Sequence, residues 1–261
     1  MTLRALVGSL LAFGLATAAP AARAGGFSTT NVQLLQGYSF SDDWFQNGAG
    51  EHPKHGTVTT LTLNNFETWE YGDSFAFADL MRYSTPAVAE RSTVYLEWHP
   101  RLFLNQLFGQ KEMGFIKNWG IAAEVNQGEN FYAYLAGLGL DLGIPGFAVA
   151  GLNIYYRYDE YVFHTWQVSP FWTIPFSLGK VPFLFTGFVD VNGTKYGPDR
   201  KNGVEVWAQP ELLVDVLAPF GGKGNKLYVG SEWWIHSGYA FGATKTTLTS
   251  APQVMVQWNM F

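Results

Sequence analysis

The segment TVYLEWHPRLFL, from Thr93 to Leu104, alternates between two kinds of side chain, and this alternation constrains the possible folds more than any other feature of the chain. Every second residue is apolar: Val94, Leu96, Trp98, Pro100, Leu102 and Leu104. The residues between them, three of which are ionisable, are Tyr95, Glu97, His99, Arg101 and Phe103. A period of two is typical of an extended strand with two different faces. The segment 92–104 is therefore predicted to be a strand with one apolar and one charged face.

The rest of the chain repeats this pattern in short segments separated by turn residues. Gly, Pro, Asn and Asp are frequent between the segments, as tight turns require. The connections Glu70–Asp73 and Gly143–Gly146 are short, whereas those over 41–56, 190–203 and 237–250 are long and polar. The twelve predicted strands are 31–40, 57–69, 74–82, 92–104, 115–125, 130–142, 147–158, 164–176, 181–191, 204–217, 226–238 and 253–261.

The composition narrows the class of protein. Only 14% of the 261 residues are charged and 17% are aromatic, whereas a soluble domain carries about 25% charged residues. The chain has no Cys, so it can form neither a disulfide framework nor a thiolate metal site. Beyond the N-terminus it has no apolar run of about 18 residues, which a membrane-spanning helix needs. The hydrophobicity is instead spread over the predicted strands.

The N-terminal residues have the features of an export signal. Arg4 precedes an apolar run over 5–19, and Ala22-Arg23-Ala24 matches an A-x-A cleavage site. We expect a cleaved signal peptide at 1–24 and a single domain over 25–261; an uncleaved anchor helix is the alternative. Losing Arg4 and Arg23 would lower the formal net charge from −5 by two units, to −7. Such an acidic chain is not expected to bind nucleic acid, which requires basic patches.

These features predict an all-β fold, a transmembrane antiparallel up-and-down β-barrel of about 12 strands. Alternation alone would also fit a soluble β-sandwich. The expected export, strands long enough to cross a bilayer, and aromatic residues near strand ends favour the barrel. A closed barrel also pairs every strand edge, as lipid demands. The final residue, Phe261, is aromatic like the last residue of many outer-membrane barrels, and ten or fourteen strands are alternative counts.

Four segments in order carry a family resemblance: NNFETWEYGDSFAFADL (64–80), YLEWHPRLFLNQL (95–107), GFIKNWGIAAEV (114–125) and GLGLDLGIPGFAVAGLNIYYRYDEY (137–161). Their most specific pieces are Trp69 with Tyr71-Gly72-Asp73, Glu97 with Pro100-Arg101, and Lys117 with Trp119. With them the chain resembles, over about 27–261, the Tsx-like family of nucleoside-specific outer-membrane channels, which includes the OmpK-type phage-receptor porins. The resemblance implies a monomeric twelve-stranded barrel with a narrow lumen and passive uptake of nucleosides. The first strand and the outer loops depart most from the family pattern.

If the apolar faces meet lipid, the opposite faces line the lumen. The lumen residues proposed as substrate-binding candidates are Tyr95, Glu97, His99, Arg101, Phe103, Glu124, Glu205, Trp207, Glu211, Glu232, Trp234 and His236. Aromatic rings could stack on a nucleoside base, and the polar groups could bind its ribose. Glu97 and Arg101 lie roughly 13 Å apart along a strand, so each is predicted to contact a neighbouring strand. The alternative is that these charges pair across the lumen only to maintain its shape.

Other functions receive less support from the sequence. The chain has no G-x-S-x-G nucleophile motif, so no enzyme is predicted. Glu51, His52 and His55 share one loop, but this spacing is too unspecific to predict a metal site, and no cofactor is expected. The second functional hypothesis is a surface receptor or adhesion barrel with a closed lumen, of the phage-receptor type, in which Trp44 and Phe45 could contact a partner.

The expected partners follow from the predicted location in a bacterial outer membrane. They are nucleosides or other small solutes, outer-membrane lipid and lipopolysaccharide, the barrel assembly machinery and, in the receptor hypothesis, a bacteriophage. The barrel itself is expected to be a monomer.

Overall fold

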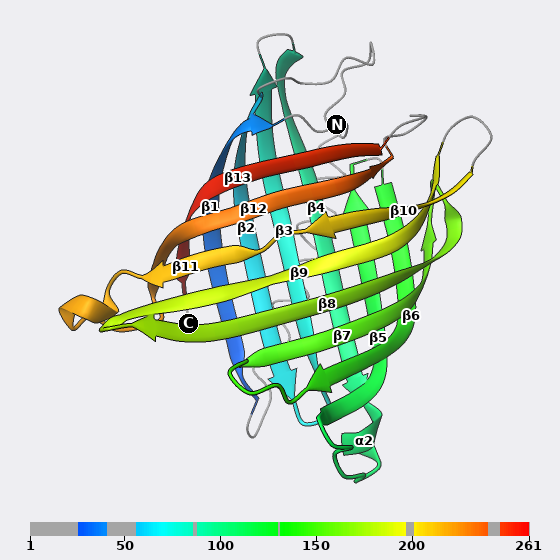
Figure 1. Ribbon diagram of the computed structural model, residues 1–261, viewed down its shortest axis with the longest axis vertical. Coiled ribbons are helices and arrows are strands. Elements are labelled where there is room, and N and C mark those ends of the chain that lie inside the picture. Colours follow the sequence, from blue (N-terminus) through cyan, green and yellow to red (C-terminus); the bar gives the residue numbers. More distant parts are fainter. Residues whose placement is uncertain are drawn as a thin grey trace.

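The computed structural model describes residues 26–40, 56–85, 88–129, 131–196, 201–239 and 246–260. These residues form thirteen β-strand segments joined into one antiparallel sheet (Figure 1). The strands are β1 (Ser28–Phe40), β2 (Gly56–Trp69), β3 (Gly72–Thr85), β4 (Val88–Phe103), β5 (Ile116–Gly128), β6 (Phe131–Leu142), β7 (Val149–Asp159), β8 (Phe163–Leu178), β9 (Val181–Tyr196), β10 (Lys201–Ala208), β11 (Glu211–Asp215), β12 (Leu227–Tyr239) and β13 (Thr246–Asn259). Two short helical turns, α2 (Leu104–Leu107) and η2 (Ala218–Phe220), complete the described elements.

The sheet closes on itself as a twelve-stranded up-and-down barrel. Each strand pairs with its sequence neighbour, and β1 pairs with β13 from Asn31↔Asn259 to Gly37↔Gln253. The segments β10 and β11 lie end to end between β9 and β12 and count as one strand. The predicted fold class and strand number are therefore confirmed. Among the described residues, no helix is both long and apolar enough to cross a membrane.

The break between β10 and β11 lies at Gln209 and Pro210, inside one predicted strand. Proline has no N–H to donate to the ladder, yet the pairings with β9 keep the same register on both sides, as Ala208↔Val189 and Glu211↔Thr186 show. Opposite the break lies Gly187, whose φ is +145° and where an added Cβ would lie 2.5 Å from the Gln209 carbonyl oxygen. The two faces of the predicted strand 204–217 therefore stay in phase across the interruption.

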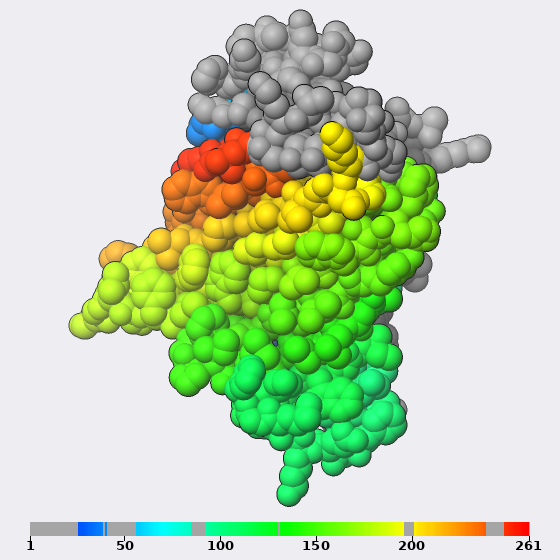
Figure 2. Space-filling view, turned by 45° about the vertical axis from the view of Figure 1, so that its right-hand side comes forward, coloured from blue at the N-terminus to red at the C-terminus, as the bar shows by residue number. Residues whose placement is uncertain are grey.

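The two faces of the barrel wall differ in polarity in the opposite sense to a soluble protein. The large apolar side chains exposed on the outer face include Leu34, Leu61, Leu80, Trp98, Leu102, Ile121, Leu138, Ile154, Val204, Leu212, Val229, Trp233 and Val254. The buried polar side chains on the inner face include Gln33, Thr60, Thr62, Asn64, Asp79, Gln167, Asn192 and Gln253. Neighbouring strands pack into a wall on the side shown in Figure 2. This distribution is expected for a barrel in lipid with a polar interior.

The two rims of the barrel differ in their connections. One rim has the tight turns 70–71 and 179–180 together with α2 and η2, which lie at the lower and left side of Figure 1. At the other rim, β9 continues to Tyr196 and β12 to Tyr239, so the predicted long loops over 190–203 and 237–250 are wrong. The polar residues of 190–203 have the composition of a loop, but Asn192 and Thr194 are buried inward-facing residues of β9. Most of the third predicted loop, 41–56, lies outside the described residues.

The segment that defined the alternation forms β4, with one difference from the prediction. Strand β4 ends at Phe103, and Leu104 begins α2 instead of extending the apolar face. Pro100 causes no bulge, because the β4–β5 register is the same at Trp98↔Val125 and at Arg101↔Ala122. His99 and Pro100 form no pair with β5 between these two positions, so the β4–β5 ladder is interrupted at the proline without a change of register.

Substitution of Gly187 tests whether the barrel depends on the backbone conformation opposite Pro210. Gly187→Ala should lower the free energy of unfolding by about 1–3 kcal/mol, because its φ is one that L-residues rarely adopt. Denaturant unfolding of the detergent-folded barrel, followed by tryptophan fluorescence, measures this change. Gly128→Ala is the matched control, since its Cβ would lie at ordinary contact distance, 3.4 Å from Phe131 Cβ and 3.5 Å from Tyr95 Cδ2. Equal losses of unfolding free energy in the two variants would show that the barrel does not depend on the backbone conformation of Gly187.

Candidate functional site

All twelve candidate residues project from the inner face of the barrel. Six are buried: Glu97, Arg101, Phe103, Glu124, Glu232 and His236. The other six are half-buried: Tyr95, His99, Glu205, Trp207, Glu211 and Trp234. They do not form one site, because the structure distributes them among four groups along and around the lumen.

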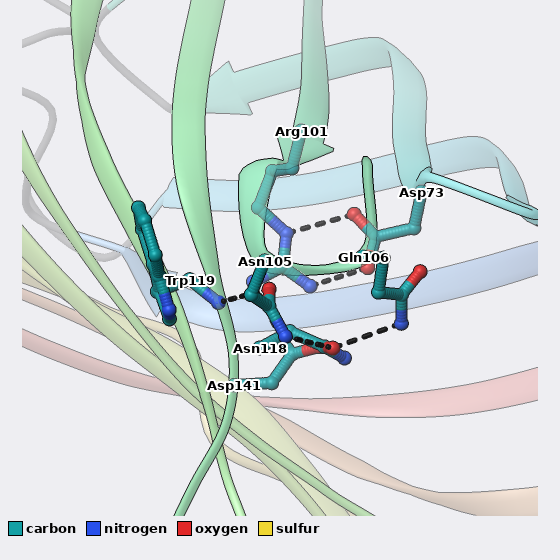
Figure 3. A network of polar contacts seen from close by, with 7 residues as sticks. All are labelled: Asp73, Arg101, Asn105, Gln106, Asn118, Trp119 and Asp141. Atoms are coloured by element: carbon teal, nitrogen blue, oxygen red, sulfur yellow. Dashed lines mark hydrogen bonds and ion pairs between the residues drawn. The ribbon is translucent and has the colours of Figure 1, made fainter. Parts of the chain in front are cut away.

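The first group is centred on Arg101, near the rim of the tight turns (Figure 3). Its Nε donates to Asp73 Oδ1 at 2.7 Å and its Nη2 contacts Asp73 Oδ2. Its Nη1 lies 2.8 Å from Asp141 Oδ1. The guanidinium also lies over the rings of Phe171 and Phe103, at 4.9 and 5.1 Å. Arg101 thus joins β3, β4, β6 and β8 across the lumen, which confirms that it contacts neighbouring strands.

The helical turn α2 continues this network at the rim. Asn105 is buried; its Oδ1 accepts from the Trp119 backbone N–H at 3.0 Å and its Nδ2 donates to the Lys117 carbonyl at 3.2 Å. Asn118 Nδ2 donates to Asp141 Oδ2 at 3.0 Å, and Asn118 Oδ1 accepts from Gln106 at 2.8 Å. Figure 3 shows these side chains converging below Arg101. Sequence reasoning missed Asn105, Asn118 and Asp141 as partners, although Asn118 lies inside the Lys-x-Trp motif.

The second group lies in the middle of β4 and β5. Glu97 accepts hydrogen bonds from Tyr95 Oη at 2.5 Å, and its Oε2 lies 2.7 Å from His99 Nε2. His99 Nδ1 lies 3.3 Å from Glu124 Oε2 on the neighbouring strand. The prediction that Glu97 contacts a neighbouring strand is therefore wrong for its hydrogen bonds, which go to residues two positions away on its own strand. Residues two apart share one face at about 7 Å, within reach of tyrosine and histidine side chains.

Arg157 belongs to the same region and was not singled out from the sequence. Its Nε donates to Asp159 Oδ2 at 2.9 Å and its Nη1 donates to Gln167 Oε1 at 2.5 Å. The alternation of β7 could have identified Arg157 as a lumen residue, because Arg157 shares the inner face with Tyr155 and Asp159.

The third group lies on the other side of the barrel. Glu232 Oε1 accepts from Gln253 Nε2 at 2.8 Å, and Glu211 pairs in register with Glu232 on β12. Asp79, which sequence reasoning did not select, accepts from Thr62 at 2.5 Å and interacts electrostatically with both glutamates. Carboxyl groups therefore face one another here with uncharged hydrogen-bond donors around them.

The fourth group combines stacked rings with a carboxylate. The rings of Trp207 and His236 stack with centroids 3.6 Å apart and an interplanar angle of 9°. His236 Nε2 lies 2.9 Å from Glu205 Oε1, and Asn192 donates to Glu205 Oε2 at 3.1 Å. The edge of Trp234 meets Trp207 at 5.9 Å. This group lies toward the rim opposite α2 and offers flat ring surfaces beside hydrogen-bonding groups.

Several predicted features lie outside the described residues. They are the signal peptide 1–24, the loop residues Trp44, Phe45, Glu51, His52 and His55, and the terminal Phe261. Their proposed roles stay predictions.

A closed antiparallel barrel with an apolar outer face and a polar inner face defines the class of outer-membrane β-barrels. Sequence comparison adds that the outer membrane protein OmpK of Vibrio parahaemolyticus is 24% identical over 183 residues, which cover 60% of this chain. The match spans 65% of the length of OmpK. It confirms the resemblance to the OmpK and Tsx-like outer-membrane proteins that the sequence motifs indicated.

The other comparisons add little. No protein-family model matches the chain. The translocator domain of autotransporter NalP from Neisseria meningitidis aligns with a TM-score of 0.40 and 13% identity, covering 98% of this chain and 95% of that one. A bacterial polysaccharide outer membrane secretin aligns with a TM-score of 0.38 and 8% identity, covering 89% of this chain and 98% of the other.

The contacts of Arg101 indicate that shortening its side chain should cause a large loss of stability. Arg101→Met should lower the free energy of unfolding by about 3–5 kcal/mol, because it leaves the buried carboxylate of Asp73 without its partner. Denaturant unfolding in detergent measures the loss, and adding Asp73→Asn should restore part of it.

The exposed ion pair between Lys117 and Glu112 supplies the control for this prediction. Its atoms lie 2.6 Å apart, but both side chains are about half exposed, so Lys117→Met should change stability by only about 0–1 kcal/mol. A loss in Arg101→Met no larger than that in Lys117→Met would show that the network does not stabilise the barrel.

Proposed function

We propose that this protein is an outer-membrane channel for the passive, selective diffusion of small solutes, with nucleosides as the favoured class. The observation that carries the proposal is the stack of Trp207 on His236 beside Glu205, inside the lumen. The resemblance to OmpK supports an outer-membrane location and a channel role.

The fourth group has the two kinds of surface that a nucleoside needs. A base can stack on the exposed part of Trp207 or Trp234, which is worth about 1–3 kcal/mol per base. Ribose hydroxyls can donate to the Glu205 carboxylate, which already accepts hydrogen bonds on both oxygens. Such contacts are individually weak, and transport requires weak sites because a tightly held solute would not leave.

The inner wall also favours neutral over anionic solutes. Carboxyl groups outnumber guanidinium groups on the described inner face, and Arg101 and Arg157 are already paired with Asp73 and Asp159. A wall of this charge repels phosphate, so nucleosides should enter more readily than nucleotides.

A receptor or adhesion barrel with a closed lumen is the second candidate function. It is favoured by the close packing of inward side chains: Glu124 is 1% exposed, and Gln167 and Leu213 are 0% exposed. The two candidates differ in whether the purified barrel conducts.

Planar-bilayer recordings of the purified barrel test the channel. Adenosine or thymidine should reduce the ionic current, and Trp207→Ala should weaken this block about 5- to 150-fold, the equivalent of one lost stacking contact. Trp233→Ala is the matched control, because Trp233 lies on the outer face of β12, next to Trp234, and is 47% exposed. The control should retain the block of the unmodified protein.

The other outcomes separate the hypotheses. A current that no nucleoside reduces would leave a channel without the proposed selectivity. The absence of any current in a barrel shown to be folded would favour the receptor.

A further inference from the structure

We propose that Glu97, His99 and Glu124 form a binding site for a divalent transition-metal cation inside the barrel. One carboxylate oxygen from each glutamate and one ring nitrogen of His99 all lie within 4.8 Å of one another. This inference goes beyond the proposed transport function and does not depend on it.

The strand geometry brings the three ligands together. Glu97 and His99 are two residues apart on β4 and therefore share its inner face. The flanking pairs Trp98↔Val125 and Arg101↔Ala122 place His99 directly opposite Glu124 on β5. Because the third ligand comes from a neighbouring strand, the spacing of residues along the sequence could not reveal the cluster.

Buried oxygens beside the cluster provide a second, independent observation. The Tyr155 hydroxyl and Asn126 Oδ1 have no hydrogen-bond partner among the described residues, and both residues are at most 3% exposed. Both lie near Glu124: Asn126 interacts with its carboxylate, and among charged groups Tyr155 interacts most strongly with it. Glu124 Oε1 likewise has no partner within the described part of the chain. Buried oxygens without donors are rare in folded proteins, and a bound ion is one arrangement that satisfies them.

The negative charges in and around the cluster would favour the binding of a cation. Two buried carboxylates face each other across one imidazole, and Asp190 adds a third acidic group nearby. The guanidinium of Arg157, which interacts electrostatically with Glu124, is already engaged by Asp159 and Gln167. Without metal, a protonated His99 can donate to both glutamates, since the imidazolium has two N–H groups. A metal ion would replace a ring proton and take over the neutralisation of both carboxylates.

The ligand atoms determine which cations fit. One imidazole nitrogen with two carboxylates is a donor set that suits Zn²⁺ and related ions such as Mn²⁺ or Ni²⁺. Ca²⁺ and Mg²⁺ prefer oxygen ligands alone, so they should bind more weakly. Tyr155 or Asn126 could supply a further oxygen.

Titration calorimetry with Zn²⁺ tests the site in the full-length barrel, folded in detergent and carrying no polyhistidine tag. We expect one saturable site, with affinity reduced at least about 10- to 100-fold in His99→Ala and in Glu124→Gln. Glu97→Gln is the conservative third variant and keeps the test possible if His99→Ala does not fold. Heat-dependent gel migration verifies that each variant is folded.

His52 and His55, which belong to the predicted loop 41–56, provide the matched control. His52→Ala combined with His55→Ala removes two other histidines without touching β4 or β5, and it should leave the Zn²⁺ affinity unchanged. X-ray absorption of the zinc-loaded protein should show nitrogen and oxygen ligands only. The proposal is overturned if the unmodified barrel binds no Zn²⁺, if folded Glu97→Gln and Glu124→Gln bind it as well as the unmodified protein, or if the loop variant abolishes binding.

Discussion

The pairing of β1 with β13 is the constraint on which the rest of the structure depends. Lipid offers no hydrogen-bond partner to a strand edge, so the sheet can be stable in a membrane only when its first and last strands meet. Closure over Asn31↔Asn259 to Gly37↔Gln253 achieves this. It also brings twelve inner faces toward one axis, where many polar side chains are buried and hydrogen-bond to one another.

The inner face meets this requirement differently at its two ends. Near the tight turns, Arg101 and the carboxylates of Asp73 and Asp141 form an ion-paired network that α2 extends with Asn105 and Gln106. Toward the other rim, Trp207 stacks on the buried His236, which contacts Glu205, while Trp207, Trp234 and Glu205 are half-buried. The first end is expected to contribute most to stability, and the second contains the proposed solute site.

The sequence predicted the faces of the strands well and the contacts between them poorly. A period of two determines which residues point inward, so Glu97, Arg101, Glu205 and His236 were all correctly assigned to the inner face. The contact partners of these residues were harder to predict. Arg101 of β4 contacts Asp141 of β6, which is not the neighbouring strand, and such a contact depends on barrel curvature and side-chain length.

The strand ends were predicted least well. Asn192 and Thr194 have the composition of a loop but occupy β9 with their side chains buried. The three motif pieces that carried the family resemblance, around Asp73, Arg101 and Lys117–Trp119, meet in one network at the turn rim. The motif residues behind the resemblance therefore concern the structure of this rim, and they say less about the solute that the lumen binds.

The Arg101 network also has a consequence for the order in which the barrel assembles. Its guanidinium needs carboxylates from both β3 and β6, and Asp141 is held in turn by Asn118 of β5. If β4 left water before β6 arrived, it would carry a charge with half of its partners missing, which is costly in a medium of low polarity. Strands β3 to β6 should therefore come together as one cooperative unit before this part of the chain inserts.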